Sequence, residues 1–244
     1  MSFEEKIKKI AGDREHGSSV LVDHICQELA SLERDPAYEK RLKWAFRELR
    51  KIDESMVVVH HLLDSLEPCI GPDFPDELKA YESRWRNIHR DIARHLLEKQ
   101  DFTGQTVLMH SHSGMLIGVA AEVAGQAEGL HVWQTRSEPG GEGESQYQEL
   151  RSRDIKAWLI EDERLPDIVA RLDAAWLGVD QFNDEFFVNK LGSRRIVGLM
   201  QSVQKPVFVL GDSRKKVHQL KFSEEIFEKT PFGQNVFLIT ESSE

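Results

Sequence analysis

The sequence predicts an α/β protein in which an N-terminal helical bundle, residues 1–99, precedes a Rossmann-like domain with a parallel sheet, residues 100–244. Two observations carry this prediction. Apolar residues recur at intervals of three and four through the first ninety-odd residues, which is the period of an amphipathic helix. After Thr103 the pattern changes to short apolar runs that alternate with amphipathic segments. Strands that alternate with helices indicate a parallel sheet with right-handed crossovers.

Proline and glycine divide the helical part of the sequence. Asp35-Pro36 ends the first pair of helices, and Gly71-Pro72-Asp73-Phe74-Pro75 interrupts the chain again. A further helix is expected from about Pro75 to Lys99, with Trp85 and Ile92 on its apolar face. The apolar positions that mark the preceding helices are Ile25, Leu29, Leu32, Leu42, Phe46, Leu49, Val57, Val58 and Leu62.

Six apolar runs are the expected strands of the second domain. No Gly-x-Gly-x-x-Gly follows the first of them, so a dinucleotide is not the favoured ligand. Ligands of such sheets nevertheless bind beyond the carboxyl ends of the strands. The runs are Thr106–His110, His131–Gln134, Ala157–Ile160, Ala174–Val179, Val207–Leu210 and Val236–Ile239, and the amphipathic segments between them are 115–127, 144–153, 164–172 and 192–203.

Composition restricts the classes of function. The chain has 244 residues, of which 40% are hydrophobic and 30% charged, and its formal net charge is −10. This acidic balance argues against a nucleic-acid partner, because binding DNA or RNA needs a basic face. No apolar run approaches the roughly 20 residues of a membrane span, and the charged segment Met1–Ile10 lacks a secretory apolar region. We therefore expect a cytoplasmic protein without a membrane partner.

The two cysteines, Cys26 and Cys69, lie far apart and have no metal-ligand spacing. Neither a disulfide framework nor a zinc site is expected from such a pair. We expect no metal and no cofactor.

The most informative stretch is Thr106–Gly114, a short apolar strand that ends in a small polar turn before a helical segment. The first N–H groups of a helix have no intrahelical partner and can receive a phosphate or a carboxylate. Ser111, Ser113 and Gly114 are small enough to let an anion approach the backbone. His110 and His112 add two groups that can titrate near neutral pH.

Polar residues also follow three other expected strands, and parallel strands bring their carboxyl ends to one edge of a sheet. These residues are Arg136 and Glu138 with the loop Gly140–Gly143 after the second strand, Asp180, Asn189 and Lys190 after the fourth, and Asp212 and Ser213 after the fifth.

Each of these residues also has a purely structural interpretation. Asp180 would cap a turn, Lys190 would be a solvated surface lysine, and His110 would be a hydrogen-bonded core histidine. Arg136 and Glu138 would pair across a mobile loop. The coincidence of polar groups at all four strand ends favours a functional interpretation.

Motifs follow one another in a recognisable order along nearly the whole chain. They are His16-Gly17-Ser18-Ser19, Asp53-Glu54-Ser55-Met56, His110-Ser111-His112-Ser113-Gly114, Gly178-Val179-Asp180, Asn189-Lys190-Leu191-Gly192-Ser193, Phe208-Val209-Leu210-Gly211-Asp212-Ser213, Phe227-Glu228-Lys229-Thr230-Pro231 and Ile239-Thr240-Glu241. In this order the chain resembles the family that joins the regulatory α, β and δ subunits of eukaryotic translation initiation factor 2B with methylthioribose-1-phosphate isomerase and ribose-1,5-bisphosphate isomerase.

The resemblance implies a helical N-terminal domain, a Rossmann-like C-terminal domain and dimerisation through the α/β part, for which the apolar segment Leu199–Phe208 is a candidate. The isomerases carry a catalytic cysteine in the first turn and a catalytic aspartate, which is matched here by Asp180. Ser111 occupies the cysteine position, as is common in the regulatory subunits. An unactivated hydroxyl does not exchange protons at neutral pH as a thiol does, so Ser111 would need His110 or His112 as a base.

Two further departures separate the chain from the enzymes. Their Glu-x-Arg-Pro is replaced by Arg136-Ser137-Glu138-Pro139, and an Arg-Gly pair that helps them hold a phosphate is replaced by His16-Gly17. Both changes weaken the case for a bisphosphate ligand. Asn189 and Lys190, which in the family contact the sugar phosphate, match intact.

Three functions are compatible with these residues. We favour a non-catalytic protein, similar to an initiation factor 2B subunit, that binds a sugar phosphate or nucleoside phosphate at the C-terminal edge of the sheet. The alternatives are an aldose–ketose isomerase of a phosphorylated ribose derivative and a structural assembly subunit with a vestigial site. The expected partners are a phosphorylated small molecule, a second copy of the chain and other proteins. The candidate ligand-binding residues are His110, Ser113, Gly114, Arg136, Asn189 and Lys190, and the candidate catalytic residues are Asp180, Ser111 and His112.

Overall fold

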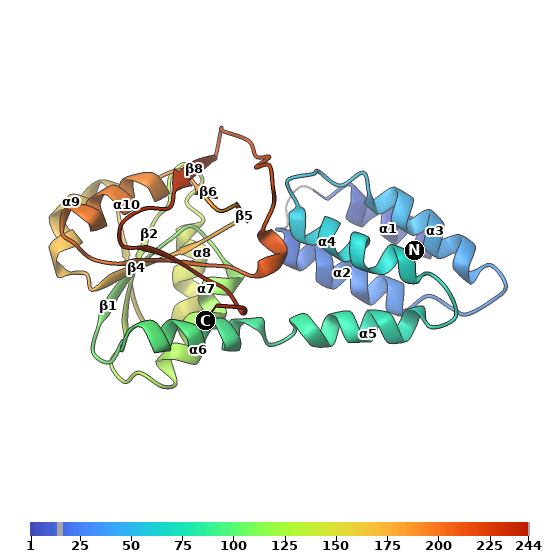
Figure 1. Ribbon diagram of the computed structural model, residues 1–244, viewed down its shortest axis with the longest axis horizontal. Coiled ribbons are helices and arrows are strands. Elements are labelled where there is room, and N and C mark those ends of the chain that lie inside the picture. The colour runs from blue at the N-terminus through green and yellow to red at the C-terminus, as the bar shows by residue number, and fades with distance from the viewer. Residues whose placement is uncertain (14–16, 244) are drawn as a thin grey trace. The chain divides into compact units, whose positions relative to one another are not determined.

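A computed structural model describes residues 1–13 and 17–243, and it is drawn in Figure 1. The chain forms two compact units, Met1–Asn87 and Ile88–Glu244. His16, one of the motif residues of the N-terminal part, lies outside the described residues.

The first unit is helical, as the sequence predicts. Its core is formed by one apolar face of each helix, and Phe46 and Phe74 meet there edge to face with ring centroids 5.9 Å apart. Ser2 caps the first helix in a capping box with Glu5, which satisfies two N–H groups at the start of that helix. The helices are α1 (Phe3–Ala11), α2 (Ser18–Ala30), α3 (Tyr38–Leu49), α4 (Val57–Leu66), followed by the 3-10 turn Glu67–Cys69, and α5 (Phe74–Trp85).

The helix expected over residues 75–99 is two helices instead. Helix α5 ends at Trp85, a turn follows at residues 86–87, and α6 runs over Ile88–Lys99. Asn87 is a poor helix former, and the buried face of α6, with Ile92 and Leu96, packs against helix α7 (Gly114–Ala124) of the second unit. The second unit therefore begins about twelve residues earlier than the boundary at residue 100.

A six-stranded sheet forms the centre of the second unit, and all of its strand pairs are parallel. Its strand order is β3-β2-β1-β4-β7-β9. The buried strand β4 carries Trp176, which meets Phe102 with ring centroids 4.9 Å apart. The strands are β1 (Thr106–His110), β2 (His131–Thr135), β3 (Lys156–Ile160), β4 (Ala174–Gly178), β7 (Val207–Leu210) and β9 (Val236–Ile239).

The connecting helices cover both faces of this sheet, with α6 and α7 on one side and α9 and α10 on the other (Figure 1). All six strands and the doubly wound α/β class thus confirm the predicted fold. The other helices of this unit are α8 (Gly143–Ser152), α9 (Leu165–Ile168), which is flanked by the 3-10 turns Asp162–Arg164 and Val169–Arg171, and α10 (Ser193–Ser202).

The strand order reverses between β1 and β4, which are neighbours in the sheet although β2 and β3 separate them in sequence. Connections leave these two strands toward opposite faces, and in open α/β sheets this switch point, beyond the carboxyl ends of the strands, is where ligands bind. His110, the last residue of β1, is paired with Leu177 of β4. The residues that follow, Ser111 and Asp180, therefore flank the switch point of the sheet.

A second, three-stranded antiparallel sheet follows β4 and was not expected from the sequence. It consists of β5 (Gln181–Phe182), β6 (Phe186–Lys190) and β8 (Phe227–Pro231) in the order β5-β6-β8. Lys190 ends β6 opposite Phe227. The sheet thus holds Asn189 and Lys190 in a regular strand rather than in a loop.

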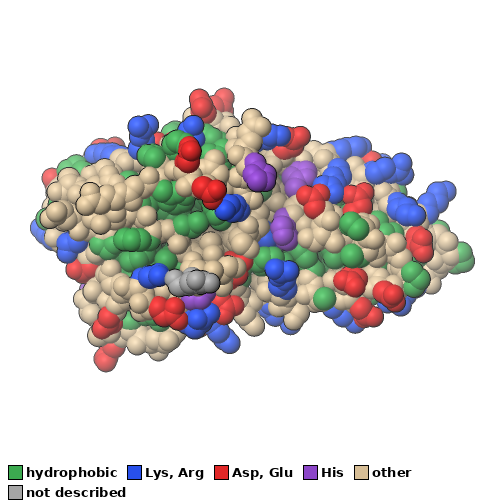
Figure 2. All heavy atoms as spheres, in the orientation of Figure 1, with side chains coloured by type: hydrophobic (Ala, Val, Ile, Leu, Met, Phe, Trp, Pro, Cys, Tyr) green, Lys and Arg blue, Asp and Glu red, His purple; other side chains and the backbone are tan. Residues whose placement is uncertain are grey.

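Four properties of the described residues bear on the other expectations. None of their helices has the length and apolarity needed to cross a membrane. Cys26 is buried and Cys69 is partly exposed, and no disulfide joins the two. On the face drawn in Figure 2, acidic and basic side chains are interspersed over each unit. The segment Leu199–Phe208 contributes Met200, Val207 and Phe208 to the buried core of the second unit, so these apolar side chains are not available for a dimer contact.

Candidate functional site

The turn after β1 places two serines and the start of a helix beside the switch point. Ser113 is the N-cap of α7, and its side-chain oxygen accepts a hydrogen bond from the N–H of Leu116. A Cβ at Gly178, the last residue of β4, would lie 3.1 Å from the Ser113 Oγ. The absence of a side chain at Gly178 therefore lets the turn pack closely against the end of the neighbouring strand.

Two buried glutamines hold this turn from the side of β2 and α8. Gln146 accepts a hydrogen bond from the N–H of Ser113 at 2.7 Å and donates one to the Gln134 side chain at 2.6 Å. Gln134 in turn donates to the carbonyl oxygen of Ser111 at 3.1 Å. Both side chains are fully buried. The turn is thus preorganised by amide groups, while the first N–H groups of α7, from Gly114 onward, have no acceptor within the helix.

His110 is a buried structural residue in this arrangement. Its Nδ1 lies 2.7 Å from the Thr135 Oγ1 and its Nε2 lies 2.8 Å from the carbonyl oxygen of Leu191. Because a carbonyl oxygen only accepts, the Nε2 carries the proton and the Nδ1 accepts from Thr135. A Cβ at Gly192, where φ is 102°, would lie 3.0 Å from the ring. Both ring nitrogens are therefore engaged within the protein.

Because His110 is buried, we expect the free energy of unfolding to depend on pH. Desolvation lowers the pKa of His110, and it outweighs the Leu191 carbonyl, which acts in the opposite direction. The unfolded chain, with an ordinary histidine pKa near 6.5, binds more protons than the folded chain below that pH. The contribution of His110 is therefore fully present above about pH 6.5 and is lost as the pH falls toward the lower folded-state pKa.

We expect the free energy of unfolding of the wild type to fall by up to about 1.4 kcal/mol per pH unit below pH 6.5 on account of this residue. The His110→Gln variant is less stable at pH 7.5 but shows a shallower decline between pH 6.5 and 5.5. Urea unfolding at closely spaced pH values measures both slopes. Parallel slopes in the two proteins would show that His110 does not titrate as its burial requires.

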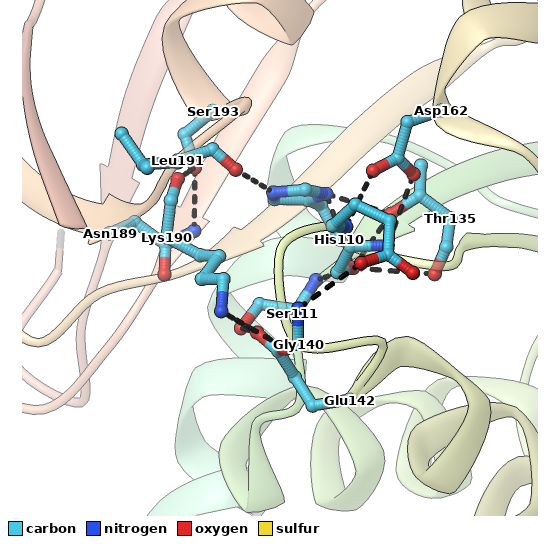
Figure 3. A network of polar contacts seen from close by, with 12 residues as sticks. His110, Ser111, Thr135, Gly140, Glu142, Asp162, Asn189, Lys190, Leu191 and Ser193 are labelled. Atoms are coloured by element: carbon cyan, nitrogen blue, oxygen red, sulfur yellow. Dashed lines mark hydrogen bonds and ion pairs between the residues drawn. The ribbon is translucent and has the colours of Figure 1, made fainter. Parts of the chain in front are cut away.

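Lys190, Glu142 and Ser111 form the polar centre of the site (Figure 3). The Lys190 side chain is 8% exposed, and its Nζ lies 3.0 Å from the Glu142 Oε1 and 3.1 Å from the Oε2. The Ser111 hydroxyl donates to the Glu142 Oε1 at 3.0 Å. Glu142 is 28% exposed, so this carboxylate lies between a buried ammonium group and the solvent. Lys190 is thus not the surface lysine of the structural interpretation.

The loop between β2 and α8 is built around this ion pair. Gly140 has φ 112°, and a Cβ there would lie 2.9 Å from the Glu142 Oε2 and 3.3 Å from the Lys190 Nζ. Asp162 fixes the start of the loop by accepting hydrogen bonds from the N–H groups of Ser137 at 3.0 Å and of Glu138 at 2.7 Å. The Ser137 hydroxyl accepts from the N–H of Ser111 at 2.7 Å. The loop and the turn after β1 therefore form one connected structure.

Asn189 precedes Lys190 and is buried beside it. Its side-chain amide donates to the Ser193 Oγ at 3.0 Å, and the Ser193 hydroxyl donates to the Lys190 carbonyl at 2.7 Å. These bonds fold the chain back from the end of β6 into the N-terminus of α10. Asn189 in this arrangement orients the backbone that carries Lys190.

Asp180 lies beyond the end of β4, on the other side of the switch point. The residue is solvent-exposed, yet the protein around its carboxyl displaces enough water to raise its pKa. The ammonium of Lys215 opposes this rise. The Lys215 Nζ donates to the carbonyl of Val179 at 2.6 Å and thereby also fixes the backbone next to Asp180. A carboxyl with a raised pKa beyond the carboxyl end of a strand is a candidate proton-transfer group.

Asp212 pairs internally rather than facing a ligand. Its two carboxylate oxygens accept from the Arg214 guanidinium at 2.8 Å and 3.2 Å. Burial alone would raise the pKa of Asp212, but Arg214 and Lys215 outweigh it and hold the pKa below its ordinary value. This pair stabilises the turn after β7.

Two residues of the predicted site are engaged elsewhere. The Arg136 guanidinium binds Glu161 at 2.7 Å and Glu144 at 2.9 Å in partly exposed ion pairs. His112 is exposed and its Nε2 lies 2.9 Å from a carboxylate oxygen of Glu149. The hydrogen-bond partner of the Ser111 hydroxyl is therefore Glu142, whereas the sequence pointed to His110 or His112.

Glu142 is the residue of the site that sequence reasoning missed. It lies in the Gly140–Gly143 loop, which drew attention only as a mobile or closing segment. The signal was the set of glycines around it, since Gly143 also lacks room for a side chain, with a Cβ there 1.9 Å from the Thr135 carbonyl oxygen. No cluster of three or more His, Cys, Asp or Glu side chains suited to a metal ion occurs within residues 1–13 and 17–243.

The fold and site define a doubly wound α/β protein with a buried ammonium group and a helix N-terminus near its switch point. Within that class, the chain belongs to the Initiation factor 2 subunit family, whose model matches residues 12–243. The eIF2B subunit alpha of Caenorhabditis elegans is 23% identical over 203 residues, which cover 77% of this chain and 67% of the worm protein. The same subunit of Dictyostelium discoideum is 27% identical over 130 residues, covering 53% of this chain and 40% of that protein.

Solved structures share the fold at low sequence identity. The translation initiation factor eIF-2B of Pyrococcus horikoshii OT3 superposes with a TM-score of 0.81 at 20% identity, covering 98% of this chain and 94% of that chain. The 5-methylthioribose 1-phosphate isomerase of the same organism has a TM-score of 0.81 at 14% identity, and the match covers 98% of this chain and 83% of the isomerase chain. A translation initiation factor and an isomerase are therefore equally similar to this chain in fold, and the fold alone does not choose between their functions.

Proposed function

We propose that this protein is a non-catalytic eIF2B-subunit-like protein that binds a sugar phosphate or a nucleoside phosphate beyond the carboxyl ends of β1 and β6. The observation that carries the proposal is the buried Lys190 ammonium, held beside the Ser111 hydroxyl near the switch point. A compact cation on a rigid strand is suited to a phosphate group. The N-terminus of α7, capped by Ser113 and beginning at Gly114, adds N–H groups that favour an anion.

We propose that Ser113, Gly114, Asn189 and Lys190, which the sequence predicts as ligand-binding residues, form the site together with Ser111. Asn189 acts by orienting Lys190. His110 supports the site from within the core, and Arg136 is held by two carboxylates.

We propose that the protein does not turn over its ligand because of the groups that surround Ser111. A hydroxyl needs a positioned base to act as a nucleophile or proton carrier. His110 uses both ring nitrogens within the core, and His112 pairs with Glu149. The Ser111 hydroxyl instead donates to the Glu142 carboxylate, which also neutralises Lys190. This arrangement suits a binding group better than an activated one.

An isomerase is the second candidate, because Asp180 keeps a raised pKa beside the switch point. In that case Asp180 would carry a proton between two carbons of the bound sugar, and the hydroxyl at position 111 would serve only to position the ligand.

Assembly is the second part of the proposal. One family neighbour in fold, with a TM-score of 0.73, belongs to a tetrameric eIF2B-beta2-delta2 complex from C. thermophilum. We propose that this chain also works with protein partners, including a second copy of itself, through surfaces of its α/β unit other than the buried side chains of Met200, Val207 and Phe208.

Phosphorus NMR of the purified protein with ribose 1,5-bisphosphate, methylthioribose 1-phosphate or AMP separates these functions. We expect at least one ligand resonance to broaden without the appearance of new resonances. New resonances that are lost in the Asp180→Asn variant would show an isomerase and contradict the non-catalytic proposal. Unperturbed spectra for all three compounds would contradict ligand binding and favour a structural subunit.

A further inference from the structure

A negative charge already occupies the anion-binding groups of the free protein. The Glu142 carboxylate accepts from both the Lys190 ammonium and the Ser111 hydroxyl, at distances of 3.0 and 3.0 Å to its Oε1. These are the same groups that the proposed function assigns to a phosphate. A carboxylate and a phosphate oxygen need the same kind of donors. Two anions beside one ammonium group also repel each other, so a phosphate at Lys190 disfavours the carboxylate at the same position.

The loop that carries Glu142 is shaped for this contact. A Cβ at Gly140 would lie 2.9 Å from the Glu142 Oε2 and 3.3 Å from the Lys190 Nζ, so a larger residue there would crowd both groups of the pair. Glu142 also occupies the N-cap position of α8, yet its side chain makes no capping hydrogen bond. A carboxylate at that position would ordinarily be stabilised by the helix N–H groups. Here the side chain turns instead to Lys190.

Glu142 differs in accessibility from the lysine that it neutralises. Its side chain is 28% exposed, whereas that of Lys190 is 8% exposed. A partly exposed carboxylate loses little when it moves into water, while a buried ammonium group needs a negative partner. When a ligand anion replaces the Glu142 carboxylate at Lys190, the ammonium group therefore still has a negative partner.

We infer that the Glu142 carboxylate competes with the phosphate of the ligand for Lys190 and Ser111. The carboxylate occupies this position in the free protein and must be displaced before a phosphorylated ligand binds. This inference rests on the proposed function. It deepens that function by assigning a specificity-determining residue: only a ligand whose anionic group interacts with Lys190 better than a carboxylate does will displace Glu142. A dianionic phosphate is therefore favoured over a carboxylic acid.

Calorimetric titration of ribose 1,5-bisphosphate and AMP into the wild type and the Glu142→Gln variant tests the inference. Glutamine keeps an oxygen for Ser111 and Lys190 but removes the competing charge, so we expect about tenfold tighter binding by the variant. Glu163→Gln is the matched control, because it removes one charge from an exposed position after β3; its affinity should equal that of the wild type within a factor of two or so. Thermal unfolding of each variant verifies that the fold is retained.

Weaker or unchanged binding by Glu142→Gln, in a wild type that binds either compound, would overturn the inference and leave the proposed function standing. An equal gain in Glu163→Gln would also overturn it, because the effect would then belong to the net charge. No binding by the wild type and both variants would contradict the proposed function itself. The double variant Glu142→Gln with Lys190→Ala should lose the gain in affinity, because Lys190 is the group for which Glu142 competes.

Discussion

Lys190→Ala is expected to weaken binding of ribose 1,5-bisphosphate or AMP at least about a hundredfold, because it removes the buried cation of the proposed site. The Lys190 ammonium is 8% exposed and is held on strand β6 by pairing with β8. A group so placed has few rotamers to lose when a ligand binds, and it interacts with a phosphate in surroundings that contain little water. Titration calorimetry of the variant and the wild type measures the difference.

The fold should tolerate this change. Glu142 loses an ion-pair partner but keeps the Ser111 hydroxyl and a 28% exposed side chain, so the free energy of unfolding should fall by only about 1 kcal/mol. Lys156→Ala is the matched control, since Lys156 is exposed at the amino end of β3, whereas the proposed site lies beyond the carboxyl ends of the six-stranded sheet. An affinity of Lys190→Ala equal to that of the control would exclude Lys190 from the ligand site.

Gly143→Ala is expected to lower the free energy of unfolding by about 3 kcal/mol, the largest stability effect foreseen here. A Cβ at this position would lie 1.9 Å from the Thr135 carbonyl oxygen and 2.9 Å from the carbonyl carbon of Arg136. Both atoms belong to backbone at the end of β2, so no side-chain rotation relieves the overlap. Either the start of α8 or the end of β2 must move.

Gly198→Ala is the control for this prediction. Gly198 lies within α10, and a Cβ there would have no atom within 4 Å apart from its chain neighbours and the nearby backbone of its own helix. Alanine is the better helix former by up to about 1 kcal/mol, so Gly198→Ala should be neutral or stabilising. Urea unfolding of both variants provides the comparison. Equal stability of the two would mean that the approach of Gly143 to Thr135 is not as close as described.

The predicted strands of the large sheet were confirmed because their sequence pattern is unambiguous. Strands buried on both faces are continuous apolar runs, and Val207–Leu210 or Ala174–Gly178 cannot be anything else when amphipathic segments separate them. The same alternation predicts the doubly wound topology. Local patterning and overall fold agree in this part of the chain.

The small antiparallel sheet escaped prediction because none of its strands has such a pattern. Strand β5 has two residues, and β6 and β8 combine apolar with polar positions, including Asn189 and Lys190. The pairing of β6 with β8 joins segments about forty residues apart, which no local period reports. The break between α5 and α6 was missed for a related reason, since the apolar period continues across Arg86-Asn87 while the two helices bury their faces in different units.

The candidate site was predicted as a set of strand ends, but not in its individual contacts. Strand topology brings Ser111 and Asp180 to the switch point whatever their side chains do. Hydrogen-bond partners depend on the loops, and sequence says little about these. His110 became a core residue because Thr135 and Leu191 take both of its nitrogens, and Arg136 was drawn to Glu144 and Glu161. Glu142, in contrast, gained a role that only the glycines beside it had signalled.

Hydrogen exchange of the backbone amides, with and without the phosphate compound that binds most tightly, tests the location of the site most directly. We expect the ligand to slow exchange in segments 111–116 and 189–194, which contain the turn after β1 and the end of β6. The loop at residues 137–143 should exchange faster or unchanged, because the ligand displaces Glu142. Protection confined to the helical unit, residues 1–87, or to the amino ends of the strands would contradict a phosphate site at the switch point.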